Sequence, residues 1–201
     1  MLVLYGRHYF RRYRVLSDLI EPEKKVLELA CGPAILYKRF LKSKSVVYTG
    51  LDINETFVEA LQSTRAQGLL WDLREDREFP EADYVVMQAS LYHFLPEPEA
   101  VIERMLRAAR EAVIIAEPIR NWSNSYSSIF SALGRRLTDP GTGQHTLRFS
   151  EEMFDKLFES YSQLVVKSFL IPGGREKVYV LDTSQRSRVD AVQNTRDSRQ
   201  T

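Results

Sequence analysis

Three acidic residues lie in or directly after short apolar runs in the first half of the chain. Glu28 lies inside the run KVLEL, Asp52 follows the next run at GLD, and Asp72 follows a third at LLWD. A carboxylate at the end of such a run accepts hydrogen bonds from ribose hydroxyls or from an exocyclic amine. An acid inside a run is costly to bury without a partner. The three acids predict a site for a ligand with hydroxyls and amines rather than a pyrophosphate.

The segment after the first run, ACGPA at residues 30–34, consists of small residues. Gly32 can adopt backbone conformations closed to other residues, and Pro33 suits the first turn of a helix. Such a turn lets a ligand approach the backbone and points the free N–H groups of the next helix at it. Asp52 follows Gly32 by about 20 residues, the spacing of a ribose-binding acid. Asp52 and Asp72 could instead cap the helices that follow them. Glu28 could either hold the turn in its orientation or contact the ligand.

The candidates for catalysis and substrate contact are fewer. His93 follows the fourth apolar run, and an imidazole that titrates near neutral pH suits a general base; a structural hydrogen bond is the competing interpretation. Tyr92 is a weaker candidate. His145 and Arg148 are candidates for contacts with the substrate, against surface solvation. Cys31 is interpreted as a small residue of the turn, because no second cysteine or adjacent base supports covalent catalysis.

Composition narrows the class of protein. The chain has 201 residues, 44% hydrophobic and 27% charged, which is ordinary for one globular domain. A net charge of +1 argues against a nucleic-acid partner. The single cysteine makes no internal disulfide, and no cluster of Cys and His has metal-ligand spacing, so we expect no metal. We find no signal peptide and no apolar run of ~18 residues, and expect a cytoplasmic protein without a membrane span.

Alternating patterns place these residues on a sheet. The apolar runs that predict strands are residues 25–29, 45–51, 68–71, 84–88, 112–116, 163–170 and 178–183. Helical patterns lie between them at residues 5–20, 34–41, 54–61 and 96–109 and after Ser150, with Asn54 as a cap. This alternation is typical of a parallel sheet with crossover helices. The turn Pro172-Gly173-Gly174 joins the last two runs too closely for a helix, so they should form an antiparallel hairpin.

The expected organisation is one domain over residues 1–183, opened by an N-terminal helix within residues 1–21. Residues 117–149 are unusually long for a connection and form an insertion on the substrate side, with a helix expected over 123–137. Trp122 and Tyr126 in this insertion suit an apolar substrate pocket, and core packing explains them equally well. Residues 184–201 are polar without periodicity and predict a disordered tail.

Four segments carry a resemblance to a known family. In order and spacing, VLELACGPA, GLDIN, WDL and ADYVVMQASLYHF resemble the motifs of class I, Rossmann-like S-adenosylmethionine-dependent methyltransferases, and AVIIAEP resembles their fifth strand. The resemblance covers about residues 5–183 and is less specific after Pro118. It implies an α/β fold with a doubly wound, mostly parallel seven-stranded sheet, an antiparallel C-terminal hairpin and helices on both faces. It also implies S-adenosyl-L-methionine as the cofactor and S-adenosyl-L-homocysteine as the product.

The resemblance further implies which residues contact the cofactor. The methionine part would lie beside Glu28, Ala30, Cys31 and Gly32, the ribose on Asp52, the adenine beside Ile53, Asp72 and Leu73, and the sulfonium and methyl beside Gln88 and Ala89. Direct in-line transfer of the methyl group to a small-molecule, sugar or lipid-type acceptor is the reaction expected. The segment QASLYHF lacks the Asn/Asp-Pro-Pro-aromatic pattern of amino-directed DNA methyltransferases, which favours a small acceptor.

Ala30 and Ala34 stand where many relatives have glycine. Alanine fits such positions unless φ is positive, so the expected turn is tighter than in those relatives but still able to bind. The two alanines leave a non-catalytic binding protein of the same fold as an alternative. A nicotinamide-dependent oxidoreductase is a weaker one, because the turn lacks the pattern G-x-G-x-x-G/A.

Overall fold

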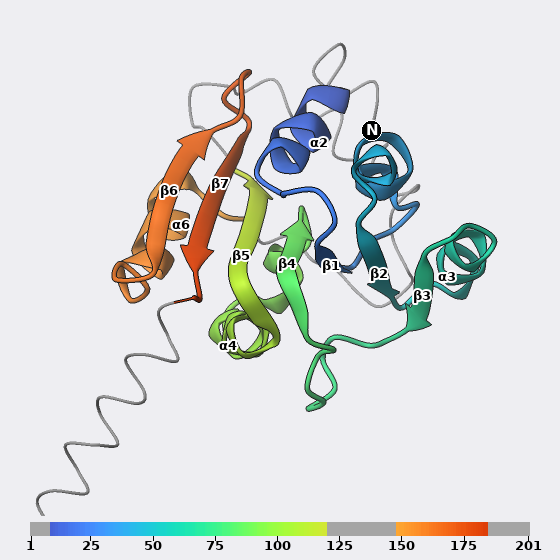
Figure 1. The fold of residues 1–201 in the computed structure, drawn as a ribbon. Helices are drawn as coiled ribbons and strands as arrows, with labels where there is room; N and C mark the ends of the chain where they lie inside the picture. The colour runs from blue at the N-terminus through green and yellow to red at the C-terminus, as the bar shows by residue number, and fades with distance from the viewer. Residues whose placement is uncertain (1–8, 120–147, 185–201) are drawn as a thin grey trace, which may run out of the picture.

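The computed structural model describes residues 9–119 and 148–184. Its centre is a seven-stranded sheet with the order β3-β2-β1-β4-β5-β7-β6 (Figure 1). The strands are β1 (Lys25–Leu29), β2 (Val47–Asp52), β3 (Gln67–Leu70), β4 (Ala82–Gln88), β5 (Ala109–Pro118), β6 (Val165–Leu170) and β7 (Glu176–Asp182). The first five strands are parallel, and β7 is antiparallel to both of its neighbours. The expected mostly parallel sheet with an antiparallel C-terminal hairpin is confirmed.

Helical segments connect these strands. They are α2 (Tyr9–Asp18), the short π-helix η2 (Tyr37–Leu41), the 3-10 helices η3 (Lys42–Lys44) and η4 (Leu91–Phe94), and the α-helices α3 (Glu55–Gln62), α4 (Glu99–Ala108) and α6 (Glu151–Glu159). Helix α4 begins later than the sequence predicted, because Pro98 occupies its N-cap. Strand β5 is longer than the predicted run 112–116, because it pairs with β4 on one side and with β7 on the other.

Local sequence signals set several boundaries as predicted. The Asn54 side chain accepts hydrogen bonds from Thr56 N at 3.0 Å and from Phe57 N, and so caps α3. Ser150 caps α6 through Met153 N at 3.1 Å. These caps satisfy backbone donors that the first turn of a helix leaves free. The β6–β7 turn contains Gly173 at φ 113, a conformation that favours glycine.

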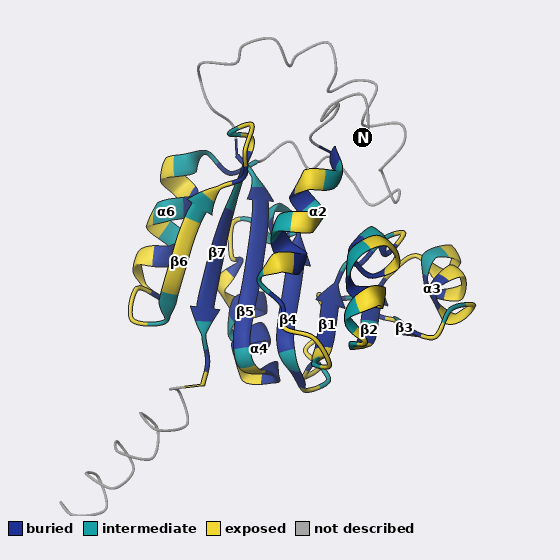
Figure 2. Ribbon diagram, turned by 45° about the horizontal axis from the view of Figure 1, so that its top comes forward, coloured by how far each residue is buried: buried dark blue, intermediate teal, exposed yellow. Residues whose placement is uncertain are grey.

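The sheet separates two apolar cores. On one face, α4 and α6 pack against a cluster that includes Val85, Met87 and Ile115. On the other face, α2, η2 and α3 pack against a cluster that includes Val86 and Ile114. Figure 2 shows the central strands buried and the outer surfaces of the helices exposed. Buried on both faces, these strands have continuous apolar sequences, as central parallel strands do.

The order of the strands reverses between β1 and β4, because the chain builds β2 and β3 on one side of β1 and returns to build β4 and β5 on the other. In doubly wound sheets, ligands bind outside the carboxyl ends of the strands at such a reversal. We call this the carboxyl edge. The 30–34 turn, Asp52, Asp72 and Gln88 all follow or end strands there.

Some expectations fall outside the described residues. Trp122, Tyr126 and His145 lie there, as do most of the 117–149 insertion, its predicted helix, and residues 185–201 of the tail. Glu117 and Pro118 belong to β5 rather than to the insertion. Within residues 9–119 and 148–184, no helix has the length and hydropathy needed to cross a membrane. The same residues contain no group of three or more His, Cys, Asp or Glu arranged to hold a metal ion.

Candidate functional site

The 30–34 turn alternates between ordinary and left-handed backbone. Ala30, Gly32 and Ala34 have φ values of 50, 51 and 52 degrees. Both alanines therefore meet the exception to the expectation that alanine fits here, because a Cβ at positive φ crowds the following carbonyl. A Cβ placed on Gly32 would meet no heavy atom within 4 Å. The backbone at Gly32 therefore faces open space, which a ligand can approach closely.

Asp52 ties the 30–34 turn to the end of β2. Its Oδ2 accepts a hydrogen bond from Gly32 N at 2.7 Å, and its Oδ1 accepts one from Asn54 N at 2.8 Å. The side chain is buried. Asn54, and not Asp52, caps α3, so the interpretation of Asp52 as the cap of this helix is wrong. Each carboxylate oxygen keeps a second lone pair for a further donor.

Glu28 is buried beside the turn and receives a hydrogen bond from the Tyr48 hydroxyl. Burial raises the pKa of Glu28 to about 8, and the nearby Asp52 carboxylate also raises it, whereas the Tyr48 hydrogen bond lowers it. The Tyr48 ring stacks on Tyr37 of η2 at a centroid distance of 4.6 Å. The acid inside β1 therefore has the buried partner that its position required.

The Cys31 side chain packs into the core below the turn. A Cβ on Gly50 would lie 2.7 Å from Cys31 Sγ and 2.6 Å from Leu61 Cδ2, so only glycine at position 50 leaves room for the thiol. Burial raises the pKa of Cys31, and the carboxylates of Glu28 and Asp52 raise it further. A thiol held protonated is a poor nucleophile, which fits the interpretation of Cys31 as a small packing residue.

The candidate adenine contacts lie at the ends of β2 and β3. Ile53 is 47% exposed although it is apolar and directly follows the buried Asp52. Asp72 is half-buried, and its Oδ1 accepts a hydrogen bond from Arg74 N at 2.9 Å. Leu73 is buried in the core. An exposed apolar side chain beside two acids suits a flat ring that carries an amine.

Gln88, at the end of β4, belongs to a buried polar network that sequence reasoning missed. Its Nε2 donates to Glu176 Oε1 at 2.9 Å, and Glu176 Oε2 lies 2.8 Å from Arg12 Nε. The sequence also predicted that the arginines of residues 11–14 form a solvated helix face, and this prediction is wrong at Arg12, which is only 2% exposed. The ion pair attaches α2 to the sheet beside the site. Ala89 follows at φ 54, with its N–H bonded to Ala116 O at 2.7 Å.

Glu117 positions the segment that carries the acceptor-side candidates. It is fully buried at the end of β5, and its Oε1 accepts hydrogen bonds from Ser90 N at 2.6 Å and Leu91 N at 2.5 Å. Burial raises the pKa of Glu117 to about 8 against the effect of these two hydrogen bonds. Glu117 lies at the end of a buried run just as Asp52 does, so the same sequence signal could have identified it, but the sequence analysis assigned it to the insertion.

Of the acceptor-side candidates, the structure brings Tyr92, His93 and Arg148 together. Tyr92 and His93 are half-buried on η4, with ring centroids 3.9 Å apart. The Arg148 guanidinium lies over the Tyr92 ring, 3.3 Å from its centroid. The segment entering α6 therefore meets the segment leaving β4 at the carboxyl edge.

Comparison with known proteins agrees with this geometry. Residues 26–112 match the family model described as a methyltransferase domain. None of the curated protein sequences matches the chain. At these low identities the solved structures show the fold alone. One similar structure is magnesium protoporphyrin IX methyltransferase from Synechocystis PCC 6803 with bound SAH, at 15% identity and a TM-score of 0.60, covering 84% of this chain and 78% of that chain. A second is the Haloferax volcanii complex between the Trm112 methyltransferase activator and a protein assigned as a methyltransferase, at 13% identity and a TM-score of 0.66, covering 89% of this chain and 92% of that chain. A third is the N-methyltransferase NodS from Bradyrhizobium japonicum WM9, at 13% identity and a TM-score of 0.59, covering 89% of this chain and 96% of that chain.

The family match spans the region that contains the 30–34 turn, Asp52, Asp72 and Gln88. The sheet around it has the strand order and the antiparallel last strand expected of the fold. The carboxyl edge provides an open backbone at Gly32 and acids at the ends of neighbouring strands. The chain therefore has the fold of the Rossmann-like methyltransferases, and its residues 26–112 match the methyltransferase domain.

Proposed function

We propose that this enzyme methylates a small-molecule, sugar or lipid-type acceptor by direct in-line transfer, and that residues 1–183 form its single catalytic domain. The choice of acceptor rests on the side chains that gather beside the end of β4. There the half-buried Tyr92 ring lies under the Arg148 guanidinium and beside His93. An aromatic surface with one cation and one imidazole suits a compact organic ligand, in which a few polar groups fix the orientation.

The described residues fit the cofactor. The open backbone at Gly32 would face its methionine part with Glu28, Ala30 and Cys31 around it. Asp52 has lone pairs left for ribose hydroxyls, and the exposed Ile53 would pack on adenine. The adenine amine and ring would meet Asp72 and Leu73, while Gln88 and Ala89 would flank the reacting centre.

When bound, S-adenosylmethionine supplies an electrophilic methyl group. The acceptor's nucleophilic atom would receive this methyl group in line with the departing sulfur, with S-adenosylhomocysteine as the product. The residues of this chain align the acceptor and exclude water, and such alignment contributes up to ~7–11 kcal/mol of barrier lowering. In this proposal His93 would take the proton that the acceptor loses.

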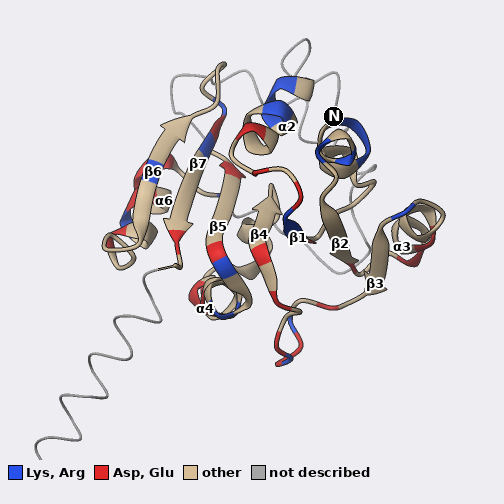
Figure 3. Cartoon of the chain, in the orientation of Figure 1, with Lys and Arg blue, Asp and Glu red and all other residues tan. Residues whose placement is uncertain are grey.

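The distribution of charge supports a small acceptor. Figure 3 shows basic and acidic residues interspersed on α4 and α6, basic residues predominating on α2, and the strands largely uncharged. The net charge of the chain is +1. A nucleic-acid substrate favours a continuous basic surface, because phosphate contacts supply much of its affinity.

Calorimetry with S-adenosylhomocysteine tests the cofactor contacts. We expect Asp52→Ala to weaken binding at least about tenfold, because a hydrogen bond to a carboxylate contributes ~1.5–3 kcal/mol. Asp83→Ala is the matched control, since Asp83 also accepts a backbone hydrogen bond, from Lys25 N at 2.7 Å, at the opposite edge of the sheet. Equal affinity in the wild type and both variants would remove Asp52 from the site.

A screen of acceptors by release of S-adenosylhomocysteine tests turnover. Turnover of a small acceptor, reduced in His93→Ala and Tyr92→Phe, supports the proposal. Binding of S-adenosylhomocysteine without turnover of any acceptor class would favour the non-catalytic alternative. Stabilisation by NAD alone would favour an oxidoreductase and overturn the assignment.

A further inference from the structure

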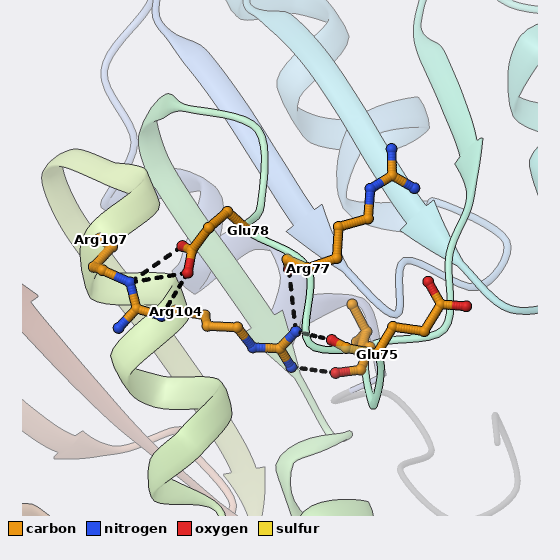
Figure 4. A network of polar contacts seen from close by, with 6 residues as sticks. Glu75, Arg77, Glu78, Arg104 and Arg107 are labelled. Carbon is orange, nitrogen blue, oxygen red and sulfur yellow. Dashed lines mark hydrogen bonds and ion pairs between the residues drawn. The ribbon is translucent and has the colours of Figure 1, made fainter.

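The loop after β3 is folded around one arginine of a different element. Arg104 of α4 donates from Nη2 to Leu73 O, and from Nη1 to Glu75 O and, at 3.2 Å, to Arg77 O. Figure 4 shows the guanidinium pointing into the loop, with its three bonds to the backbone. One side chain therefore donates hydrogen bonds to three backbone carbonyls that lie beyond the end of β3.

Between the buried Leu73 and Phe79, the loop has little packing of its own. Its residues Arg74, Glu75, Asp76 and Arg77 are all exposed. Its internal bonds are local, such as Glu75 N to Asp72 O at 3.1 Å. Loops with few buried contacts open at low free energy. Arg104 therefore provides the polar attachment of this loop to a helix of the core.

The chemistry of this attachment requires arginine. Arg104 is 7% exposed, and its guanidinium carbon lies 4.5 Å from the centroid of the Phe79 ring. A planar guanidinium offers five donors in a fixed fork, whereas an ammonium is a point charge on a flexible stem. Lysine at this position cannot reach carbonyls on both sides of the fork while keeping the ring contact.

The neighbouring Arg107 provides a contrast on the same helix. It forms an exposed ion pair with Glu78, at 2.8 Å, across the same gap between α4 and the loop region (Figure 4). Exposed pairs of this kind contribute little, because solvent screens them and ordering two long side chains costs entropy. Arg107 is thus a matched control for loss of a cation from this helix face.

We propose that Arg104 is a positioning residue for adenine recognition, because it holds Leu73 and the adjacent Asp72 in the orientation that receives the adenine ring and its amine. This inference rests on the adenine contacts put forward under the proposed function. Arg104 itself touches neither cofactor nor acceptor. Its loss releases the loop, and the acid at Asp72 then samples positions from which it no longer accepts from the amine.

Two probes that differ only at the adenine amine isolate this effect. S-adenosylhomocysteine carries the amine, and S-inosylhomocysteine carries an oxygen in its place. We expect the wild type to bind S-adenosylhomocysteine roughly tenfold or more tightly than S-inosylhomocysteine, because a hydrogen bond to a carboxylate usually contributes that much affinity. The preference should approach one in Arg104→Met, take an intermediate value in Arg104→Lys, and remain at the wild-type value in Arg107→Ala. A role in stability alone would weaken both ligands equally and leave their ratio unchanged.

Calorimetry on each folded variant gives the ratio directly, and Arg104→Lys carries the test where Arg104→Met does not fold. A wild-type ratio in both Arg104 variants would overturn the inference while leaving the proposed function intact. A wild type that binds both probes equally would overturn it as well, since Asp72 would then not read the amine. Failure of the wild type to bind either probe would count against the proposed function itself.

Discussion

Replacing Ala30 with glycine should stabilise the protein, although glycine normally destabilises. Ala30 has φ 50, where a Cβ is strained, and the conformation is imposed by the turn that Asp52 holds through Gly32 N. Glycine at this position removes the strain and keeps the backbone. The substitution therefore tests the left-handed geometry that distinguishes this turn from an ordinary one.

The magnitude follows from two opposing effects. An L-residue in the left-handed region costs about 1–2 kcal/mol, and the greater freedom of glycine in the unfolded chain offsets ~0.4–1 kcal/mol of that. Ala30→Gly should gain roughly 0.5–1 kcal/mol, or about 1–4 °C in Tm for a chain of this size. At Ala34, which has φ 52, the methyl group is fully buried, and losing it costs ~0.8 kcal/mol. Ala34→Gly should therefore be close to neutral.

Urea unfolding followed by circular dichroism measures the difference. Ala60→Gly is the control, because Ala60 is exposed in α3 and the same substitution there should cost about 1 kcal/mol. Ala30→Gly should move the midpoint up where Ala60→Gly moves it down. Equal destabilisation by the two substitutions would refute the left-handed assignment at Ala30.

Three further predictions concern buried groups. Burial raises the pKa of Glu117 from 4.5 to about 8, so between these pH values the folded protein keeps a proton that the unfolded chain loses, and stability falls as the pH rises. The Tm of Glu117→Gln minus that of the wild type should therefore grow from pH 5 to 8, and a constant difference would contradict this. Arg12→Met should destabilise by about 3–5 kcal/mol in urea by leaving the Glu176 charge buried without its cation, and adding Glu176→Met should restore part of it, whereas simple additivity would count against the pair. Cys31, the only cysteine, should react with a thiol reagent far more slowly in the native protein than in urea, because it is buried and its pKa is raised; rapid labelling of the native state would show otherwise.

Much of the fold was predictable because its signals are local. The apolar runs marked the strands, Asn54 and Ser150 marked helix starts, and the turn at residues 172–174 marked the hairpin. The acids at strand ends were predictable for a related reason: parallel strands end at one edge, so residues far apart in the chain meet there. The order of the motifs was therefore enough to predict the sheet and its carboxyl edge.

The tertiary structure decided what depends on distant or backbone partners. Arg12 looked solvated because its partner, Glu176, lies 164 residues away in the chain. The role of Arg104 could not be predicted, since its partners are backbone carbonyls that no side-chain pattern reveals. The sign of φ at Ala30 depends on how the turn is anchored to β2, and not on alanine's own preference. The sequence determined which groups reach the carboxyl edge, and long-range packing determined how each of them is held there.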